Sequence, residues 1–551
     1  SEQDDTFWCN SSLEGFPVSE ATVNVSNADR AKVRQHGWQS LKAGNHKAAL
    51  AIADQLINSA APEAPDYLFA GEVHFTLGNY RGTDNLAGQA IELFPDDVNA
   101  RVLKCRALMA MGRLGQARTT ALDLAGMEIV DEAHIEILVT VLSGLMEADA
   151  AYPLCRQSVD RHPDDPRAQR RLALTCRLVG RFEEARDAAS RALAADPHDY
   201  EMIGLRSAVT TATPERNHVE ELEGLIEAGC RTPLGAARVA YALAKENEEL
   251  GNPERSFRFL EAGAQFKRHT FNYDLDRDLR SIGLIEKTYS QDMLQRASQG
   301  FPSNEPIFIL GLPRTGSTLL ERILSSHSDV YAAGELMHFN ASMSAELERI
   351  GAPQDFDGQM AKIGDCEPAR IGKGYVGRTR PFTGHTKHFI DKRPLNFLLI
   401  GMIALALPGA RIIHVRRTPL DACFAIYKFL FNEAYPWSYS LDDIARYYIA
   451  YRRLMDHWRK TLPDRIIDVT YENVVEDIEG EARSLLEHLE LEWEPDVLRF
   501  HENKAAAMTG SAAQVRKKIY SSSVGRWRDY EEQLKYVAFA LETAGFDPYT
   551  P

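Results

Sequence analysis

The stretch PIFILGLPRTGSTLLERILSSH, residues 306–327, decides the fold of the C-terminal half. Residues 307–310 are branched or aromatic and predict a short buried strand. Residues 317–326 carry apolar side chains at helical spacing and predict a helix. Gly311 and Gly316 bound the loop between these two elements. The loop amides and the positive end of the helix dipole then point to one spot, which suits a bound phosphate.

The spacing Gly311-x4-Gly316 is that of a P-loop, but the residues that follow it differ. A nucleoside triphosphatase has Lys and then Ser or Thr after the second glycine, whereas this chain has Ser317 and Thr318. The cation lies inside the loop, at Arg314. We therefore predict a nucleotide with one 5′-phosphate-linked leaving group. The alternative is a packing turn, but an arginine at a helix N-terminus is unfavourable without an anion.

The motif LPRTGST, residues 312–318, resembles the 5′-phosphosulfate loop of sulfotransferases, which use 3′-phosphoadenosine-5′-phosphosulfate (PAPS). The pattern is similar to that of tyrosylprotein sulfotransferases and of bacterial sulfotransferases with tetratricopeptide (TPR) repeats. The resemblance covers the chain from about Glu305 to its C-terminus, together with the repeats upstream. It implies PAPS as the donor and no metal. The loop residues that it implies as donor contacts are Arg314, Thr315, Gly316, Ser317 and Thr318.

A repeat with a period of 34 residues runs through the N-terminal half. Its nodes are Gly44, Gly78, Gly112, Met146 and Gly180. Five positions after each node stands a small residue, where two helices must approach closely: Ala49, Thr83, Ala117, Ala151 and Ala185. A 34-residue period with these features is typical of TPR helix pairs, which stack into an α-solenoid. A chance series of glycines would not produce the column of small residues.

The chain is too long for one ordinary domain, and the patterns divide it into four parts. Residues 1–28 are polar and aperiodic and predict a flexible tail. Residues 29–200 are predicted to be TPR repeats, and residues 201–300 degenerate repeats with linking helices. Residues 301–551 form the predicted sulfotransferase domain. The concave face of the repeats would hold a peptide or protein segment, unless the array is a structural arm or an oligomer contact.

The C-terminal part alternates predicted strands with predicted helices. Further strands are expected at 388–391, 411–415 and 465–469, and helices at 396–407 and 419–431. This alternation predicts a P-loop-like, three-layer α/β domain with a parallel sheet and helices on both faces. Ligands of such sheets lie beyond the carboxyl ends of the strands, where the residues below are found.

The resemblance also implies three catalytic residues. Glu335, in AAGELMHF, stands in a Gly-Glu pair at the distance from the loop arginine that the family has for its catalytic base. Lys392, directly after a predicted strand, matches the lysine that contacts the transferring group, and Arg314 would stabilise the same group. His338 is a second candidate for the base, but for this residue helix packing is the favoured interpretation.

The segment HVRRTPLDACFAIYK is the expected 3′-phosphate element. Residues 417–419, Arg-Thr-Pro, align with the Arg-Asp-Pro of the family, so the resemblance implies that Arg417 binds the phosphate. The family usually adds a serine eight residues later, where this chain has Ala425. Lys428 or Tyr427 would compensate for the missing hydroxyl.

Tyr471, in VTYENV, matches a nucleotide-contacting tyrosine of the family, although a core tyrosine is nearly as good an interpretation on chemistry alone. Residues 511–527 are polar, basic and glycine-containing, and they resemble the C-terminal loop that closes over adenine and the 3′-phosphate. A solvated basic face is the alternative. The implied contacts of this loop are Ser511, Gln514, Val515, Arg516, Lys517 and Arg526.

Composition limits the partners and the compartment. The net charge of −16 argues against a general nucleic-acid binder, and no apolar run is long enough to span a membrane. The seven cysteines are scattered and have no metal-binding spacing, which favours a reducing compartment. With no export signal at the start of the given sequence, we expect a cytoplasmic protein. Whether it forms a homodimer is left open.

These residues favour an enzyme that transfers a sulfuryl group from PAPS to a hydroxyl, with a peptide or protein tyrosine as the expected acceptor. A glycan or small metabolite is an alternative acceptor. A TPR scaffold that keeps a weakened nucleotide site is a second class of function, which Ala425 favours. A kinase would need the absent loop lysine and an acidic Mg²⁺ ligand, for which only Asp391 is available. Residues 340–386 are expected to cover the acceptor side.

Overall fold

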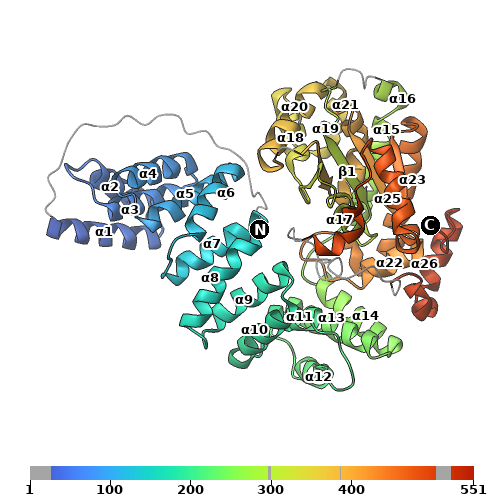
Figure 1. Cartoon of the computed structure of the whole chain (residues 1–551), viewed down its shortest axis with the longest axis horizontal. Helices are drawn as coiled ribbons and strands as arrows, with labels where there is room; N and C mark the ends of the chain where they lie inside the picture. Colours follow the sequence, from blue (N-terminus) through green and yellow to red (C-terminus); the bar gives the residue numbers. More distant parts are fainter. Residues whose placement is uncertain (1–26, 296–299, 385, 504–522) are drawn as a thin grey trace. The chain divides into compact units, whose positions relative to one another are not determined.

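The computed structural model describes residues 27–551 apart from 296–299, 385 and 504–522 (Figure 1). Residues 1–26 of the predicted tail are outside the described residues, and Asn27 and Ala28 begin the first helix. The chain divides into two compact units, residues 1–141 and 142–551. This division falls inside helix α7 (Glu132–Gly144), so the repeats continue into the second unit.

The described part of the first unit consists of helical hairpins. Its helices before α7 are α1 (Asn27–Lys42), α2 (His46–Ile57), α3 (Ala64–Thr76), α4 (Tyr80–Leu93), α5 (Val98–Ala110) and α6 (Leu114–Ala125). The hairpin turns contain Gly44, Gly78 and Gly112, with φ of 73°, 74° and 67°. Glycine adopts this left-handed backbone at no steric cost, which explains why it stands at each of these three turns.

The second unit begins with the same pattern. Its helices α8 (Ala148–Arg161), α9 (Pro166–Val179) and α10 (Phe182–Ala195) are followed by α11 (Tyr200–Val209). Gly180 and Met146 have φ of 81° and 64°. Met146 therefore adopts the same left-handed backbone as the node glycines, although it carries a side chain. The predicted small residues are fully buried: Ala49, Thr83, Ala117, Ala151 and Ala185 are each 0% exposed. The TPR-type solenoid predicted from the 34-residue grid is confirmed.

Most of the helices between the repeats and the sheet contribute residues to the core of the sheet domain, whereas the first of them packs against the second. They are α12 (Val219–Glu227), α13 (Pro233–Glu249), α14 (Pro253–Arg268), α15 (Leu275–Thr288) and α16 (Gln291–Leu294). Gly251, with φ of 78°, joins α13 to α14. Tyr241, Phe257 and Tyr289 belong to the same buried apolar cluster as residues of the sheet. Residues predicted as degenerate repeats therefore supply part of that domain's core. The predicted boundaries at residues 200 and 300 stay a prediction.

The C-terminal domain is built on a parallel five-stranded sheet of order β2–β3–β1–β4–β5. Its strands are β1 (Pro306–Gly311), β2 (Val330–Ala332), β3 (His388–Lys392), β4 (Arg411–Arg416) and β5 (Ile466–Thr470). Ile309 of the central strand β1 lies opposite Lys392 of β3 and Ile413 of β4. The strands predicted from the sequence are confirmed.

Apolar clusters cover both faces of this sheet. Successive residues of β1 point to opposite faces, so Ile307 and Ile309 join one cluster and Phe308 and Leu310 the other. The first cluster contains residues of α17 (Ser317–Leu324) and α25 (Ile478–His488). The second contains residues of α20 (Pro368–Thr379), α21 (Ile400–Ala406), α22 (Pro419–Tyr427) and α23 (Leu441–Thr461). The three-layer α/β arrangement is therefore confirmed.

The remaining elements complete the helical layers (Figure 1). The α-helices are α18 (His338–Arg349), α19 (Phe356–Lys362), α20 (Pro368–Thr379), α21 (Ile400–Ala406), α22 (Pro419–Tyr427), α23 (Leu441–Thr461), α24 (Tyr471–Glu476) and α26 (Glu531–Thr543). The 3₁₀ helices are Ile363–Asp365, Arg380–Phe382, Pro394–Leu399, Pro436–Tyr439, Pro495–Glu502 and Arg526–Tyr530. Among the helices described, none combines the length and the apolar character needed to cross a membrane.

Two predicted helices have different bounds. The helix expected at 396–407 begins as a 3₁₀ turn and becomes α-helical only at Ile400. The helix expected at 419–431 ends at Tyr427, because the chain turns at Lys428 and packs the rings of Phe429 and Phe431 against each other at 4.7 Å. This early end places Lys428 at the C-cap, where its side chain can reach other elements.

Candidate functional site

The predicted site residues lie at the carboxyl edge of the sheet. The loop after β1 holds Arg314, Lys392 ends β3, Arg417 follows β4, and Tyr471 follows β5. Parallel strands of an α/β sheet present their ligand sites at this edge. The topology therefore brings together residues that are more than 150 positions apart in the sequence.

The loop after β1 is tightly fitted to its neighbours. A Cβ at Gly311 (φ 144°) would lie 2.6 Å from the Val415 carbonyl oxygen, and one at Gly316 (φ 101°) would lie 2.4 Å from the Tyr471 ring. Arg314 itself has a φ of 67°, an uncommon backbone for a non-glycine residue. Both glycines are therefore required by the fit, and α17 starts directly after the second one.

Arg314 contacts the elements that follow β4. Its guanidinium carbon lies 4.6 Å from the centroid of the Phe429 ring, a cation–π contact. Its backbone carbonyl accepts a hydrogen bond of 3.1 Å from Nη1 of Arg417. The loop predicted for the 5′-phosphosulfate and the arginine predicted for the 3′-phosphate are thus in direct contact.

Glu335 and Lys392 form an ion pair, with Nζ of Lys392 2.5 Å from Oε1 of Glu335. The glutamate side chain is 44% exposed, whereas the lysine side chain is 1% exposed. The buried carboxyl of Glu321, on α17, also interacts with Lys392, and its own burial raises its pKa despite that cation. The carboxylate of Glu335 is therefore the group of this pair that faces solvent.

Asp391, the only acid offered for a kinase mechanism, is directed into the core. It is fully buried and accepts hydrogen bonds from the Tyr375 hydroxyl at 3.0 Å and from the Asn396 amide at 3.2 Å. Burial raises the pKa of Asp391 to about 7. Among the described residues, no group of three or more His, Cys, Asp or Glu side chains could hold a metal ion.

His338 packs inside the helical layer. Its Nδ1 lies 3.1 Å from the Thr379 hydroxyl, and its ring centroid is 5.7 Å from that of Phe382. Burial and the nearby charge of Arg378 lower its pKa. These contacts agree with the packing interpretation that the sequence favoured.

Arg417 and Tyr471 enclose the carboxyl end of β4. Nη2 of Arg417 donates to the Ser523 carbonyl, and its guanidinium lies 4.9 Å from the centroid of the Tyr471 ring. The Tyr471 hydroxyl is 2.7 Å from the Ser523 hydroxyl. Nε of Arg417 is buried without a hydrogen-bond partner in the described part of the chain. Such an orphaned donor suits an anion at this position.

Lys428 and Arg526 converge on a residue that the sequence did not indicate. Nζ of Lys428 is 2.9 Å from both carboxylate oxygens of Glu248, and Nε of Arg526 is 3.0 Å from one of them. Glu248 lies on α13, 180 positions before Lys428, so no local pattern could have revealed this contact. The predicted roles of both cations as donor contacts stay a prediction.

Only the end of the predicted C-terminal loop can be placed. Ser511, Gln514, Val515, Arg516 and Lys517 lie outside the described residues. The backbone amides of Gly525 and Trp527 donate to the two carboxylate oxygens of Asp421, at 2.6 and 3.0 Å. Asp421 was also missed, although its spacing of four residues from Arg417 was a usable signal: its Oδ2 lies 4.0 Å from Nη2 of Arg417.

Comparison with known proteins agrees with this arrangement. Residues 306–495 match the Sulfotransferase family, and residues 147–209 match the Tetratricopeptide repeat family. The chain carries a sulfotransferase domain behind TPR repeats. The family match covers β1 to β5 and therefore includes Arg314, Glu335, Lys392 and Arg417.

Two relatives and one solved structure align with parts of this chain. An uncharacterized protein of Aquifex aeolicus is 30% identical over 419 residues, which cover 74% of this chain and 54% of that protein. The chain therefore spans about half the length of this relative. A protein-tyrosine sulfotransferase of Drosophila melanogaster is 23% identical over 51% of this chain and 59% of its own length. The sulfotransferase domain of a Synechococcus olefin synthase aligns with a TM-score of 0.33 and 21% identity, over 45% of this chain and 96% of that domain.

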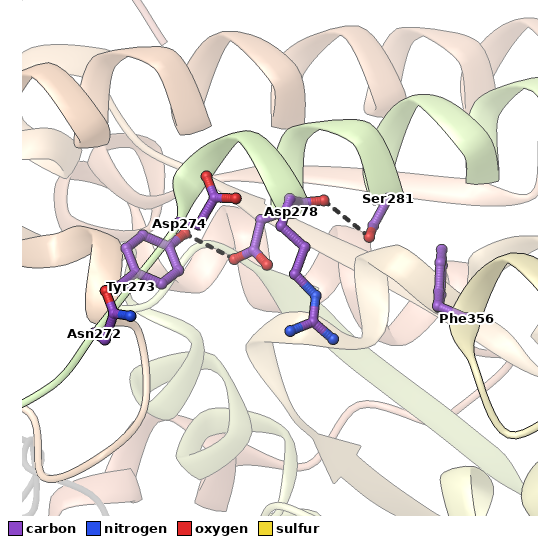
Figure 2. A pocket seen from close by; sticks show the side chains of 7 residues that line it. Asn272, Tyr273, Asp274, Asp278, Ser281 and Phe356 are labelled. Carbon is purple, nitrogen blue, oxygen red and sulfur yellow. Dashed lines mark hydrogen bonds between the residues drawn. The ribbon is translucent and has the colours of Figure 1, made fainter. Parts of the chain in front are cut away.

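A surface pocket of about 480 Å³ lies elsewhere in the same unit (Figure 2). Its lining residues are Asn272, Tyr273, Asp274, Arg277, Asp278, Ser281 and Phe356. Figure 2 shows Asp278 and Ser281 on α15, Asn272, Tyr273 and Asp274 just before it, and Phe356 from α19. The Tyr273 hydroxyl donates to Asp278 at 2.8 Å. The pocket contains none of the residues predicted to be catalytic or to bind the donor, although Phe356 falls within residues 340–386, which were expected to cover the acceptor side.

Proposed function

We propose that the protein transfers a sulfuryl group from PAPS to an acceptor hydroxyl. The observation that carries this proposal is the 2.5 Å pair of Glu335 and Lys392 at the carboxyl edge of the sheet, beside the loop of Arg314. A solvent-facing carboxylate held by a buried cation is suited to accept a proton from an incoming hydroxyl. The kinase alternative loses support, because Asp391 is directed into the core.

The residues present fit the donor. The glycine-bounded loop can hold the 5′-phosphosulfate on its amides and on the hydroxyls of Ser317 and Thr318. The orphaned Nε of Arg417 supports an anion at the 3′ position, and the Tyr471 ring closes the same side of the loop. When bound, PAPS supplies an activated sulfuryl group, and the cationic side chains offset the charge on its oxygens.

Glu335 acts as the general base in this mechanism. Its carboxylate takes the proton of the acceptor hydroxyl while the acceptor oxygen forms a bond to sulfur. The bond between sulfur and the 5′-phosphate oxygen breaks, and its electron pair stays on the leaving adenosine 3′,5′-bisphosphate. Arg314 and Lys392 stabilise the negative charge that develops on this bridging oxygen.

A tyrosine hydroxyl of a polypeptide is the acceptor that we propose. The Drosophila relative is a protein-tyrosine sulfotransferase. Exposed Met337 stands two residues after Glu335, and Tyr435 lies close enough for the charge of Glu335 to add to the effect of burial in raising its pKa. This apolar and aromatic surrounding suits a phenol ring. The TPR repeats would then hold the flanking polypeptide.

Transfer of ³⁵S from labelled PAPS tests this proposal. The purified chain is incubated with a tyrosine peptide, its serine counterpart or an oligosaccharide, with Glu335→Gln as the inactive control. We expect label in the tyrosine peptide alone. Label in the oligosaccharide alone would contradict the proposed acceptor but keep the reaction. No transfer to any acceptor, with intact binding of adenosine 3′,5′-bisphosphate, would favour the scaffold alternative.

A further inference from the structure

Glu248 brings a carboxylate from the helical region into the predicted donor site. Its side chain is 13% exposed and forms ion pairs with Lys428 at 2.9 Å and Arg526 at 3.0 Å. Burial alone would raise the pKa of Glu248, but these two cations outweigh it and lower the pKa. Glu248 is therefore a fixed negative charge, which binds two of the cations predicted to hold the donor.

Lys428 lies on the face of α22 that carries the 3′-phosphate element. Asp421, Ala425 and Lys428 are spaced by four and three residues along α22 and its C-cap, which places them on one helical face. Arg417 lies just before the N-cap, with its Nη2 4.0 Å from Oδ2 of Asp421. Ala425 stands where the family has a serine hydroxyl, and Lys428 is the next residue on the same face. The geometry supplies a cation next to the position of the missing hydroxyl.

Arg526 reaches this face from the C-terminal segment. Asp421 binds the amides on both sides of it, those of Gly525 and Trp527, so the segment is fixed along α22. The side chain of Arg526 extends from there to Glu248 through Nε and to Asp529 through Nη1, each at 3.0 Å. Two chain segments are thus joined by one carboxylate of α13.

Both cations keep N–H groups for a ligand. An ammonium has three N–H groups and a guanidinium has five, and the two oxygens of Glu248 together with one oxygen of Asp529 cannot occupy them all. The side chains of Lys428 and Arg526 are 33% and 34% exposed, so their remaining donors are accessible. Without Glu248, the charges of Lys428 and Arg526 would repel each other, and Arg314 adds to this repulsion.

We propose that Glu248 is a positioning residue of the donor site, which holds Lys428 and Arg526 in place to bind the 3′-phosphate. Helix α13, which precedes the sulfotransferase domain, therefore completes that domain's nucleotide site. This inference rests on the proposed function, because it assumes that a 3′-phosphorylated nucleotide binds here. It also explains how the site can dispense with a serine at Ala425.

The test compares two nucleotides that differ only in the 3′-phosphate. Affinities for adenosine 3′,5′-bisphosphate and adenosine 5′-monophosphate are measured for the full chain and for Glu248→Gln. We expect roughly tenfold weaker binding of the bisphosphate and less than about twofold change for the monophosphate. A merely structural role would weaken both nucleotides equally. Glu249→Gln is the matched control, because Glu249 pairs with Lys245 on the same helix at 2.8 Å.

Glu248→Asp keeps the charge but shortens the side chain, and it covers the case in which Glu248→Gln does not fold. We expect it to weaken bisphosphate binding by about threefold. Unchanged or tighter bisphosphate binding by the folded variants would overturn the proposal, because tighter binding would identify Glu248 as a competitor of the phosphate. If the unaltered chain binds neither nucleotide, the proposed function itself fails, and this inference fails with it.

Discussion

Two lysine–glutamate pairs belong to the proposed site, and they are buried in opposite ways. In the pair of Glu335 and Lys392 the carboxylate is 44% exposed and the ammonium 1%. In the pair of Glu248 and Lys428 the carboxylate is 13% exposed and the ammonium 33%. A ligand meets the exposed member first, so the first pair offers a base and the second offers a cation. The same two residue types would thus support proton transfer in one pair and anion binding in the other.

The largest expected effect concerns the exposed carboxylate. Glu335→Gln should lower turnover by roughly 10²–10⁴-fold, because the glutamine amide cannot take the proton from the hydroxyl that receives the sulfuryl group. Its affinity for adenosine 3′,5′-bisphosphate should be nearly unchanged. Steady-state rates with the acceptor found in the ³⁵S assay, together with calorimetric titration, measure both quantities. His338→Gln is the control and should keep most of the activity; normal turnover of Glu335→Gln would remove Glu335 from the role of base.

The next largest effect is expected at Arg417, in the proposed 3′-phosphate site beside the pair of Glu248 and Lys428. Arg417→Ala should weaken binding of adenosine 3′,5′-bisphosphate by about 1.5–3 kcal/mol, because a charge-assisted contact to the 3′-phosphate is lost. Calorimetry without magnesium measures this change. Arg416→Ala, at the neighbouring position in β4, serves as the control. Equal affinities of Arg417→Ala and the unaltered chain would show that the 3′ site lies elsewhere.

The smallest expected effect is the contribution of the buried carboxylate to stability. The pKa of Glu248 is lowered in the folded chain, so its ion pairs stabilise the fold above the ordinary value of 4.5 and lose that contribution as the pH falls further. Glu248→Gln should cost about 1–2 kcal/mol at pH 7. The difference in melting temperature from the unaltered chain should shrink below pH 4.5. A difference that does not depend on pH would mean that packing, and not charge, accounts for it.

Patterns along the chain were sufficient for the main elements. The strand–loop–helix at 306–327 and the parallel sheet follow from local periodicity and from glycines whose backbone angles no other residue adopts easily. The 34-residue grid located even Met146, whose left-handed backbone matches that of the node glycines. The convergence of Arg314, Lys392 and Arg417 was also predictable, because parallel strands place their carboxyl ends at one edge.

Other features depend on contacts between distant segments. At the C-terminal end of α22, the Tyr427 carbonyl accepts a hydrogen bond from the Tyr241 hydroxyl, which lies 186 positions away in the sequence. Asp421 binds amides more than 100 positions away. The burial of Lys392 and the exposure of Glu335 likewise result from the packing of several elements around them, and no residue type specifies this in advance.

The sequence by itself determined the repeat array, the parallel sheet and the glycine-bounded loop that is predicted to bind phosphate, because each follows from a short-range pattern of glycines and apolar residues. Only the tertiary structure brought Glu248 into contact with Lys428 and Arg526. Its contact with Lys428 joins residues 180 positions apart, and an ion pair between distant segments has no periodic signature. The tertiary structure also decided which member of each lysine–glutamate pair faces solvent, since exposure depends on every element packed around the pair.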